Sequence, residues 1–149
     1  MFAARSATEA DIPAILVMMQ DFNAIEAIVF DRDAFAPRLR QLFADARLGG
    51  VLLFTVDGDS AGYAVVTYGF DLEYGGRDAF LTELYVVAAR RGQGVGKQAL
   101  AAAEAFARAG GAHALHLLVR HDNTPARALY DGAGFMTQPR LVMSKLFLR

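Results

Sequence analysis

The chain has 149 residues and a formal net charge of -1; 54% of its residues are hydrophobic and 21% are charged. These values are typical of one folded domain, so we expect a single domain over residues 1–149 with its own core, rather than a disordered chain. The sequence contains no cysteine, which excludes disulfides, thiolate metal sites and a cysteine nucleophile. The near-zero charge argues against nucleic acid as a partner, because phosphate binding needs a surplus of Lys and Arg.

Neither a membrane span nor an export signal is expected. The densest apolar run, residues 49–56, is much shorter than the ~20 residues that a transmembrane helix needs. The N-terminal segment reaches Glu9 and Asp11 before any long apolar stretch, which is unlike a signal peptide. We therefore expect a cytoplasmic protein without membrane attachment.

The N-terminal third predicts a strand followed by two helices. Residues 2–5 fit a short strand. Thr8 is followed by acidic residues and then by apolar residues at helical spacing. This pattern predicts a helix that reaches about Asn23. A second helix is expected over residues 33–47, and Gly49 is interpreted as its stop signal.

The middle of the chain predicts three strands. The apolar runs 51–56 and 61–70 flank the turn signal at residues 57–58, an Asp-Gly pair that is typical of a hairpin. A polar connection leads to the apolar run 80–87, which predicts a third strand in this group.

The C-terminal half predicts two further helices and three further strands. A helix is expected over residues 94–108, a strand over 113–119 and a short helix over 123–131. Residues 135–136 and 141–148 fit two final strands. The predicted apolar stripe of the longer helix consists of Val95, Ala99, Ala102, Phe106 and Ala109. The resulting element order is β-α-α-β-β-β-α-β-α-β-β, a mixed α/β fold.

The loop that opens the longer helix is the most informative stretch, with the sequence Arg91-Gly92-Gln93-Gly94-Val95-Gly96-Lys97. Three glycines in five positions allow backbone N–H groups to converge beside the positive end of the following helix, an arrangement that holds phosphate. Arg91 and Lys97 would add positive charge. The alternative is a glycine-rich turn that binds no ligand.

Two well-known phosphate loops do not fit these residues. The dinucleotide fingerprint needs glycine at positions 92, 94 and 97, but position 97 is Lys. The P-loop needs a glycine five residues before Gly96 and a hydroxyl residue after Lys97, where the sequence has Arg91 and Gln98.

The pattern Arg-Gly-x-Gly-x-Gly at residues 91–96 resembles the pyrophosphate loop of the GNAT superfamily of N-acetyltransferases. The preceding strand residues 84–87 resemble the cofactor-side strand of this family, and residues 123–135 resemble its second signature, Asn-x-x-Ala-x-x-x-Tyr followed by Gly-Phe. The resemblance extends over residues 80–136, whereas residues 1–79 agree only in element order. It implies the GNAT fold, a mostly antiparallel sheet of six or seven strands that is splayed in the middle and flanked by four helices.

In this family acetyl-CoA lies where the strand before the loop separates from its neighbour. By resemblance, backbone groups on this strand pair with the pantetheine arm, and amides from about residue 93 to 97 bind the pyrophosphate. Val86 and Val87 also fit simple core packing, and Asn123 also fits a helix cap. The implied cofactor-binding residues are Tyr85, Val86, Val87, Arg91, Gly92, Gln93, Gly94, Val95, Gly96, Lys97, Asn123, Ala126 and Tyr130.

Two residues are candidates for the acid–base chemistry, Tyr130 and Glu83. Attack of an amine on the thioester expels a thiolate whose parent thiol titrates near ~8.5, and a phenol that titrates near ~10 can protonate it. GNAT enzymes often use the tyrosine at the position of Tyr130; the alternative is a packing tyrosine on a short helix. Glu83, three residues before Val86, would draw the amine proton away through water, or else is a charged residue on an exposed strand.

No metal site is expected from the three histidines. His113 and His121 share one strand parity and His116 has the other, so they form no cluster with ligand spacing.

The resemblance places the acceptor site among the first two helices, the loops beside the splayed strands and the final strands. Carboxylates with aromatic walls suit a cationic amine, so we expect a small-molecule primary amine that attacks acetyl-CoA directly in a ternary complex. The alternatives are a protein lysine or N-terminal acetyltransferase, a non-catalytic acyl-CoA-binding module, and a domain whose glycine loop only turns the chain. Many relatives are dimers, which leaves a homodimer open. The acids and aromatics of these regions are Asp21, Glu26, Asp31, Asp33, Asp71, Glu73, Phe22, Phe30, Tyr68, Phe70 and Tyr74.

Overall fold

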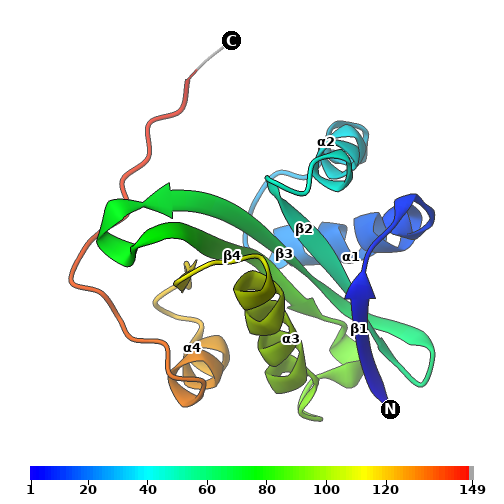
Figure 1. The fold of residues 1–149 in the computed structure, drawn as a ribbon. Coiled ribbons are helices and arrows are strands. Elements are labelled where there is room, and N and C mark those ends of the chain that lie inside the picture. Colours follow the sequence, from blue (N-terminus) through cyan, green and yellow to red (C-terminus); the bar gives the residue numbers. More distant parts are fainter. Residues whose placement is uncertain (148–149) are drawn as a thin grey trace. The chain divides into compact units, whose positions relative to one another are not determined.

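The structure, drawn in Figure 1, is a computed structural model that describes residues 1–147. The chain divides into two compact units. The first unit comprises residues 1–118, and the second begins at Val119. No helix within the described residues is long and apolar enough to cross a membrane. Each unit is described by itself below.

The regular elements follow the predicted order as far as the fourth helix. The first unit contains β1 (Phe2–Ser6), α1 (Ile12–Ile25), α2 (Arg32–Ala44), β2 (Gly49–Val56), β3 (Asp59–Asp71), β4 (Gly76–Val86), α3 (Val95–Ala109) and β5 (Leu115–Leu117). Three short 3-10 turns, Glu9–Asp11, Leu72–Tyr74 and Ala88–Arg90, connect them. The second unit contains α4 (Thr124–Gly132).

The first unit is built on one sheet with the strand order β1-β2-β3-β4-β5. Strands β1 to β4 pair antiparallel, and β5 pairs parallel with β4. The β4–β5 ladder covers only residues 79–81 of β4, although β4 continues to Val86. The last part of β4 therefore has no strand partner on this edge within the first unit, which is the separation of strands that the resemblance predicts.

A bulge in the β3–β4 ladder changes which face of the sheet the end of β4 presents. Val65 pairs with Glu83 and Val66 pairs with Leu81, so Thr82 is an extra residue on β4. Because side chains alternate along a strand, the extra residue places Glu83 on the opposite face from Leu81.

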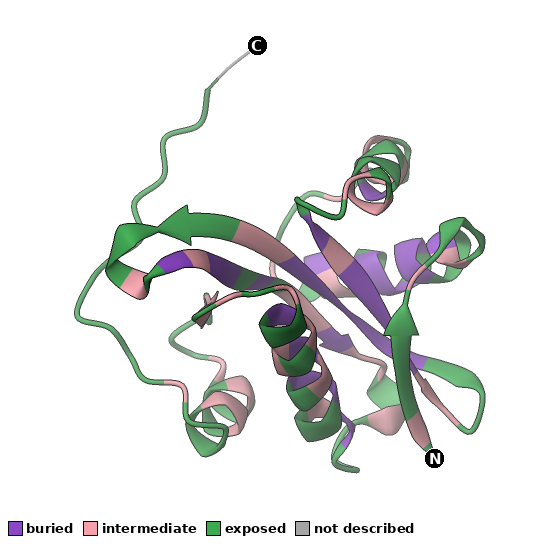
Figure 2. Ribbon diagram, viewed as in Figure 1, coloured by how far each residue is buried: buried purple, intermediate pink, exposed green. Residues whose placement is uncertain are grey.

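Helices cover both faces of this sheet (Figure 1). Helices α1 and α2 cover one face, where Ile15, Leu39, Val51 and Tyr63 belong to one buried cluster. Helix α3 lies on the other face, and Figure 2 shows the centre of the sheet as buried between these layers. The α1 side is the face on which Glu83 lies, since its register partner Val65 belongs to the same cluster.

The buried stripe of α3 differs from the predicted one. Val95 and Ala99 are buried as predicted, but Ala102 and Phe106 are only half-buried and Ala109 is exposed. Steps of four and three residues average 3.5 per turn and drift around a straight helix, and the many alanines of this helix give little contrast. The observed buried residues are Val95, Ala99, Leu100, Ala103 and Ala107.

The end of α2 also differs from the sequence-based expectation. The helix ends at Ala44 rather than residue 47, and Asp45 is extended, with its carboxylate accepting from the Arg47 N–H at 3.0 Å. Gly49 is the first residue of β2 and not a helix stop. Its φ is 143°, and a Cβ there would lie 2.0 Å from the Val66 carbonyl oxygen, so this glycine permits close strand pairing.

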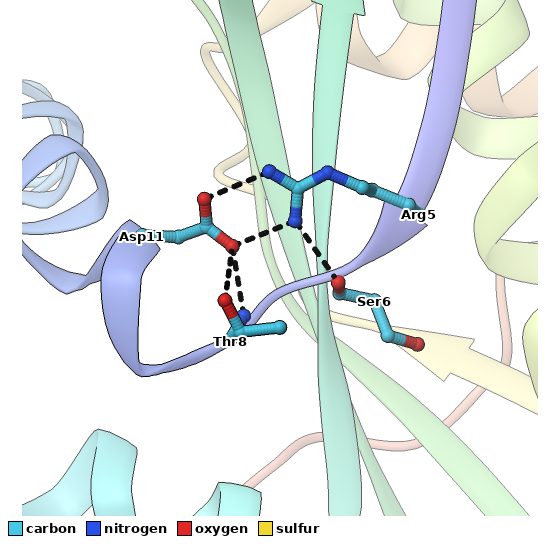
Figure 3. Close-up of polar contacts among 4 residues, drawn as sticks. All are labelled: Arg5, Ser6, Thr8 and Asp11. Atoms are coloured by element: carbon cyan, nitrogen blue, oxygen red, sulfur yellow. Dashed lines mark hydrogen bonds and ion pairs between the residues drawn. The ribbon is translucent and has the colours of Figure 1, made fainter.

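The connection from β1 to α1 is held by the Asp11 carboxylate (Figure 3). Asp11 accepts from the Thr8 N–H at 2.8 Å and from the Arg5 guanidinium at 2.7 and 2.8 Å. These donors hold the pKa of the Asp11 carboxyl far below its usual range, and the Arg5 hydrogen bond is the largest cause. Thr8 thus marks the start of the helical segment, as predicted, with a 3-10 turn before α1.

The two final strands are not present as predicted. Residues 135–147 contain no strand, and Leu148 lies outside the described residues. A strand is defined by pairing with a neighbour, and α4 is the one regular element of residues 119–147. The sheet of the described chain therefore has five strands instead of the six or seven expected.

Candidate active site

The glycine loop and the start of α3 have the local geometry of an anion site. Gly92 and Gly94 adopt left-handed φ values of 74° and 80°, and a Cβ at either position would meet nothing within 4 Å. Gly94 is the N-cap of α3 and supplies no capping side chain, and the first turn of the helix contains no acidic residue. The positive end of α3 is therefore not neutralised locally.

The N–H groups of this loop are not used by the described chain. None of the amides of residues 92–97 donates a hydrogen bond within residues 1–147, and the first donor of the helix is the Gln98 N–H to the Gly94 carbonyl at 3.2 Å. The loop itself is held by the Gln93 side chain, whose Nε2 donates to the Ala89 carbonyl at 3.0 Å. Such unpaired amides at a helix N-terminus can bind a phosphate.

The backbone of β4 presents Val86 to the open edge of the sheet. The Val87 N–H donates to the Ala61 carbonyl at 2.9 Å, so it points toward β3. The backbone N–H and carbonyl of Tyr85 also point toward β3, because these groups alternate in direction along an antiparallel strand. In agreement, the Tyr85 carbonyl oxygen lies 2.1 Å from where a Cβ on Gly62 would stand. The N–H and carbonyl of Val86 therefore point to the opposite edge, beyond the end of β5.

Arg91 connects the loop to this edge. Its Nε donates to the Val86 carbonyl at 2.9 Å, and its guanidinium carbon lies 5.5 Å from the centre of the Tyr85 ring. The side chain is exposed. One of the two backbone groups that Val86 presents is thus already engaged by the first residue of the glycine motif.

A polar cluster of two buried tyrosines, the half-buried Glu83 and the exposed Asp21 lies on the α1 face beside the same stretch of β4. The Tyr63 hydroxyl donates to Oε1 of Glu83 at 2.6 Å, and the Tyr85 hydroxyl donates to Oδ2 of Asp21 at 3.2 Å. The two tyrosine rings are 5.9 Å apart between centroids. Asp21 and Glu83 are therefore each held by a tyrosine.

Burial controls the ionisation of this cluster. Burial raises the pKa of Glu83, and the hydrogen bond from Tyr63 opposes that rise without cancelling it. Burial and the adjacent Glu83 carboxylate raise the pKa of Tyr63 far above its usual value, so Tyr63 remains a hydrogen-bond donor. A carboxylate whose pKa is raised toward neutrality is a stronger base than an exposed one.

The second unit contains the other predicted site residues. Asn123 caps α4, as predicted, by accepting from the Ala126 N–H at 3.2 Å. Tyr130 is half-buried, and its ring meets the Phe135 ring edge-on at a centroid distance of 5.8 Å. The Asn-x-x-Ala part of the second signature is thus also a capping structure.

Several acids and aromatics of the predicted acceptor region have structural roles. Asp31 and Asp71 cap α2 and the turn at residues 72–74 by accepting from the N–H two residues on, at 3.0 and 2.9 Å. Tyr68 stacks on Phe106 of α3 at a centroid distance of 6.2 Å, on the face opposite Glu83. Two residues of the predicted acceptor region do lie at the α1 face: Asp21 accepts from the Tyr85 hydroxyl, and Phe22 packs against Tyr63. Tyr63, the donor to Glu83, was not among the predicted residues.

The histidines are not gathered into a metal site. Nε2 of His116 on β5 lies 3.1 Å from the buried Asp78 carboxylate, and the Tyr74 and Phe80 rings flank the imidazole. Asp78 belongs to β4 rather than to the polar connection expected there. Within residues 1–147 no group of three or more His, Asp or Glu side chains could hold a metal ion.

Comparison with known proteins identifies the family. Residues 16–135 match the model of the acetyltransferase (GNAT) family. An aminoglycoside N(6′)-acetyltransferase type 1 from Stenotrophomonas maltophilia is 31% identical over 119 residues, which are 78% of each chain.

Solved structures show the same fold. An integron cassette protein from the mobile metagenome of Cole Harbour Salt Marsh superposes with a TM-score of 0.86 at 27% identity, over 98% of this chain and 91% of that one. An aminoglycoside 6′-N-acetyltransferase from Acinetobacter haemolyticus has a TM-score of 0.79 at 19% identity, over 99% of both chains. With the glycine loop, the splayed strand and the family match in agreement, the chain belongs to the GNAT family of acetyltransferases.

Proposed function

We propose that this protein transfers an acetyl group from acetyl-CoA to the primary amine of a small cationic molecule, by direct attack in a ternary complex. The observation that carries the proposal is the set of unpaired amides over residues 92–97 at the uncapped positive end of α3. An acyl donor with a diphosphate is the ligand that this loop suits. Because acetyl-CoA is a cytoplasmic metabolite, the proposal also places the protein in the cytoplasm.

The open edge of β4 suits the arm that joins the diphosphate to the thioester. Val86 offers an N–H and a carbonyl there, which could pair with amide groups of the arm as an added strand would. The Arg91 Nε donates to the Val86 carbonyl. Pairing of the arm with that carbonyl would release the guanidinium, which could then turn toward the diphosphate.

The proposed chemistry uses a base and an acid. The acceptor nitrogen attacks the thioester carbonyl carbon, the C–S bond breaks, and an N–C bond forms. Glu83 takes the proton of the attacking amine directly or through water, since its raised pKa suits it to that role. Tyr130 gives its proton to the departing thiolate and regains one from solvent.

Two observations support a small cationic acceptor. The Asp21 and Glu83 carboxylates lie on one face of the sheet beside the Tyr63 and Tyr85 rings, and carboxylates with aromatic rings favour organic cations. The relative from Stenotrophomonas is named for acetylation of an amine on an aminoglycoside. Such an acceptor carries several positive charges at neutral pH.

Two measurements test the proposal in sequence. Calorimetric titration with acetyl-CoA, CoA and NAD should show binding of the first two and none of NAD; binding of none of them contradicts the loop assignment. An acceptor screen that follows the released CoA thiol should then give turnover with aminoglycosides or polyamines. Turnover only with lysine peptides or peptide N-termini would favour a protein acetyltransferase, and no turnover with any amine would favour a non-catalytic acyl-CoA-binding module.

A further inference from the structure

Tyr63 is an unusual residue for its position. It lies in the centre of β3, its side chain is 0% exposed, and it is among the largest fully buried side chains of the protein. Its ring packs on Phe22 and Tyr85, with centroid distances of 6.3 and 5.9 Å. A phenylalanine would make the same packing contacts without burying a hydroxyl, and a buried hydroxyl is unfavourable unless it is hydrogen-bonded.

The partner of this hydroxyl is the proposed base. The Tyr63 hydroxyl donates to Oε1 of Glu83 at 2.6 Å, which is short for an O–H···O bond and typical of a charged acceptor. The two residues are diagonal neighbours, because Tyr63 pairs with Tyr85 and Glu83 pairs with Val65. The bulge at Thr82 brings Glu83 to the face of Tyr63, so this contact depends on one extra residue in β4.

The second oxygen of Glu83 is left for solvent. Every fully buried polar side-chain atom of residues 1–147 has a hydrogen-bond partner. In that part of the chain Glu83 has only the Tyr63 hydroxyl as a partner, through Oε1. Its Oε2 must therefore be in contact with solvent, where a water or an incoming amine can reach it.

We propose that Tyr63 is a positioning residue whose hydroxyl holds Oε1 of Glu83, so that Oε2 faces the open side of the cluster and accepts the proton of the attacking amine. The inference rests on the proposed function, since it takes Glu83 as the base. Tyr63 itself transfers no proton, because burial and the neighbouring carboxylate keep it protonated.

Among the polar groups near Glu83, Tyr63 is the one that controls the ionisation of the Glu83 carboxyl. Tyr63 faces it from β3 and Tyr85 lies beside it on β4, while Asp21 on α1 and Arg91 of the loop act on Tyr85. Within residues 1–147, no Lys, Arg or His forms an ion pair with Glu83. Loss of the Tyr63 donor would leave the half-buried carboxylate without any hydrogen bond from the protein, which favours its protonated form.

The test is the Tyr63→Phe variant, assayed with kanamycin A or with whichever amine the acceptor screen identifies. The ascending limb of the pH profile of kcat/KM should move to higher pH by about one to two units. Activity below the limb should fall by about tenfold to a hundredfold and recover at high pH, while the dissociation constant of acetyl-CoA stays unchanged. Tyr68→Phe is the matched control, because it removes a hydroxyl from the same strand on the opposite face and should leave the profile in place.

A second measurement needs no acceptor. The carboxyl carbon of Glu83, labelled with ¹³C and assigned with Glu83→Gln, should titrate at higher pH in Tyr63→Phe than in the parent protein. Glu83→Asp keeps the Tyr63 ring in the core but shortens the carboxylate arm, and it should reproduce the loss of activity. In the Glu83→Gln background, Tyr63→Phe should cause no further loss, since both act through one contact.

The outcomes separate this inference from the function on which it rests. Full turnover in Glu83→Gln overturns the role of Glu83 as the base and the positioning role of Tyr63 with it. Lost turnover in Glu83→Gln, together with an unshifted pH profile and an unshifted Glu83 titration in folded Tyr63→Phe, overturns the positioning role alone.

Discussion

The glycine loop and the tyrosine–carboxylate cluster lie close together along the chain but are built in opposite ways. The loop at residues 91–97 is exposed for the most part and offers backbone amides that the described chain does not use. The cluster around Glu83 is built on two buried tyrosines and consists of side chains in which each tyrosine hydroxyl donates to a carboxylate. A site for binding a polyanion can thus be made from main chain, whereas a site for moving protons depends on side chains with controlled ionisation.

This contrast predicts two kinds of mutational effect. Changes in acid–base side chains should lower turnover and leave acetyl-CoA affinity intact, and changes in the loop should do the reverse. The predictions below run from the largest expected effect to the smallest.

The Tyr130→Phe variant should show the largest effect, and on turnover alone. Loss of a general acid typically lowers rates by about 10²- to 10⁴-fold, and the phenylalanine ring keeps the edge contact with Phe135. Steady-state kinetics should show a fall in kcat of at least about 100-fold, while calorimetry shows the same acetyl-CoA affinity. Unchanged turnover would remove Tyr130 from the mechanism.

The Gly94→Ala variant should show the reverse pattern. A Cβ at φ 80° is strained and would stand in the open space where a diphosphate approaches the amides. The dissociation constant for acetyl-CoA should rise at least about tenfold, because the diphosphate would lose close contacts with the backbone that are worth a hydrogen bond or more.

The control for this variant is Gly58→Ala at the β2–β3 turn. Gly58 has a φ of 86° and also meets nothing within 4 Å, so alanine there carries the same backbone strain outside the loop. Equal loss of acetyl-CoA affinity in both variants would show that strain, rather than access to the amides, causes the effect.

Arg91 belongs to both regions and should give a smaller, mixed result. Arg91→Ala removes one positive charge near the loop and the bond from Nε to the Val86 carbonyl. Because the side chain is exposed, we expect acetyl-CoA affinity to fall by only about threefold to tenfold, with weaker salt dependence than in the parent protein.

Arg91→Lys separates the two contributions of this side chain. Lysine keeps the charge but cannot reproduce the planar guanidinium over Tyr85 and on Val86. If Arg91→Lys restored the salt dependence but not the full affinity for acetyl-CoA, the missing affinity would be assigned to the contacts of the guanidinium with Tyr85 and Val86. Full recovery of both would mean that charge alone matters.

The same contrast explains what the sequence could predict. The loop and the Asn123 cap are local patterns in which neighbouring residues carry the whole signal, so both could be identified without a structure. The Tyr63–Glu83 pair depends on strand register and on one extra residue at Thr82. Simple alternation from Leu81 places Glu83 on the wrong face, and a shift of one residue reverses every side chain that follows.

Other parts of the fold could not be predicted from the sequence for related reasons. The stripe on α3 was misplaced because small alanines on all sides of that helix make one face resemble another. The pattern over residues 141–147 is apolar enough for a strand, but its hydrogen bonds require a neighbouring strand that the local sequence does not supply. Local chemistry could therefore be predicted further than long-range pairing.

The smallest effect is expected at a residue outside both regions, and it should appear only in stability. Asp11 is held by Arg5 and Thr8, and its pKa is lowered in the folded protein. A lowered pKa stabilises the fold fully at pH values above the unfolded value of ~3.9, and this contribution is lost gradually as the pH falls from there through the lowered pKa of the folded protein. Asp11→Asn should therefore lower the free energy of unfolding at pH 7 by about 1 kcal/mol, or the Tm by ~2–4 °C.

The difference between the parent protein and Asp11→Asn should shrink as the pH falls below ~3.9, and it should vanish only at a pH low enough to protonate the Asp11 carboxylate in the folded protein as well. Thermal unfolding at a series of pH values measures it. Asp122→Asn is the control, because the exposed pair with Arg120 should contribute nothing measurable. If Asp11→Asn also left acetyl-CoA affinity and kcat unchanged, binding and catalysis would depend on the loop and the cluster and not on stability. A fall in either would mean that the β1–α1 connection also supports the site, through the position of α1 and its Asp21.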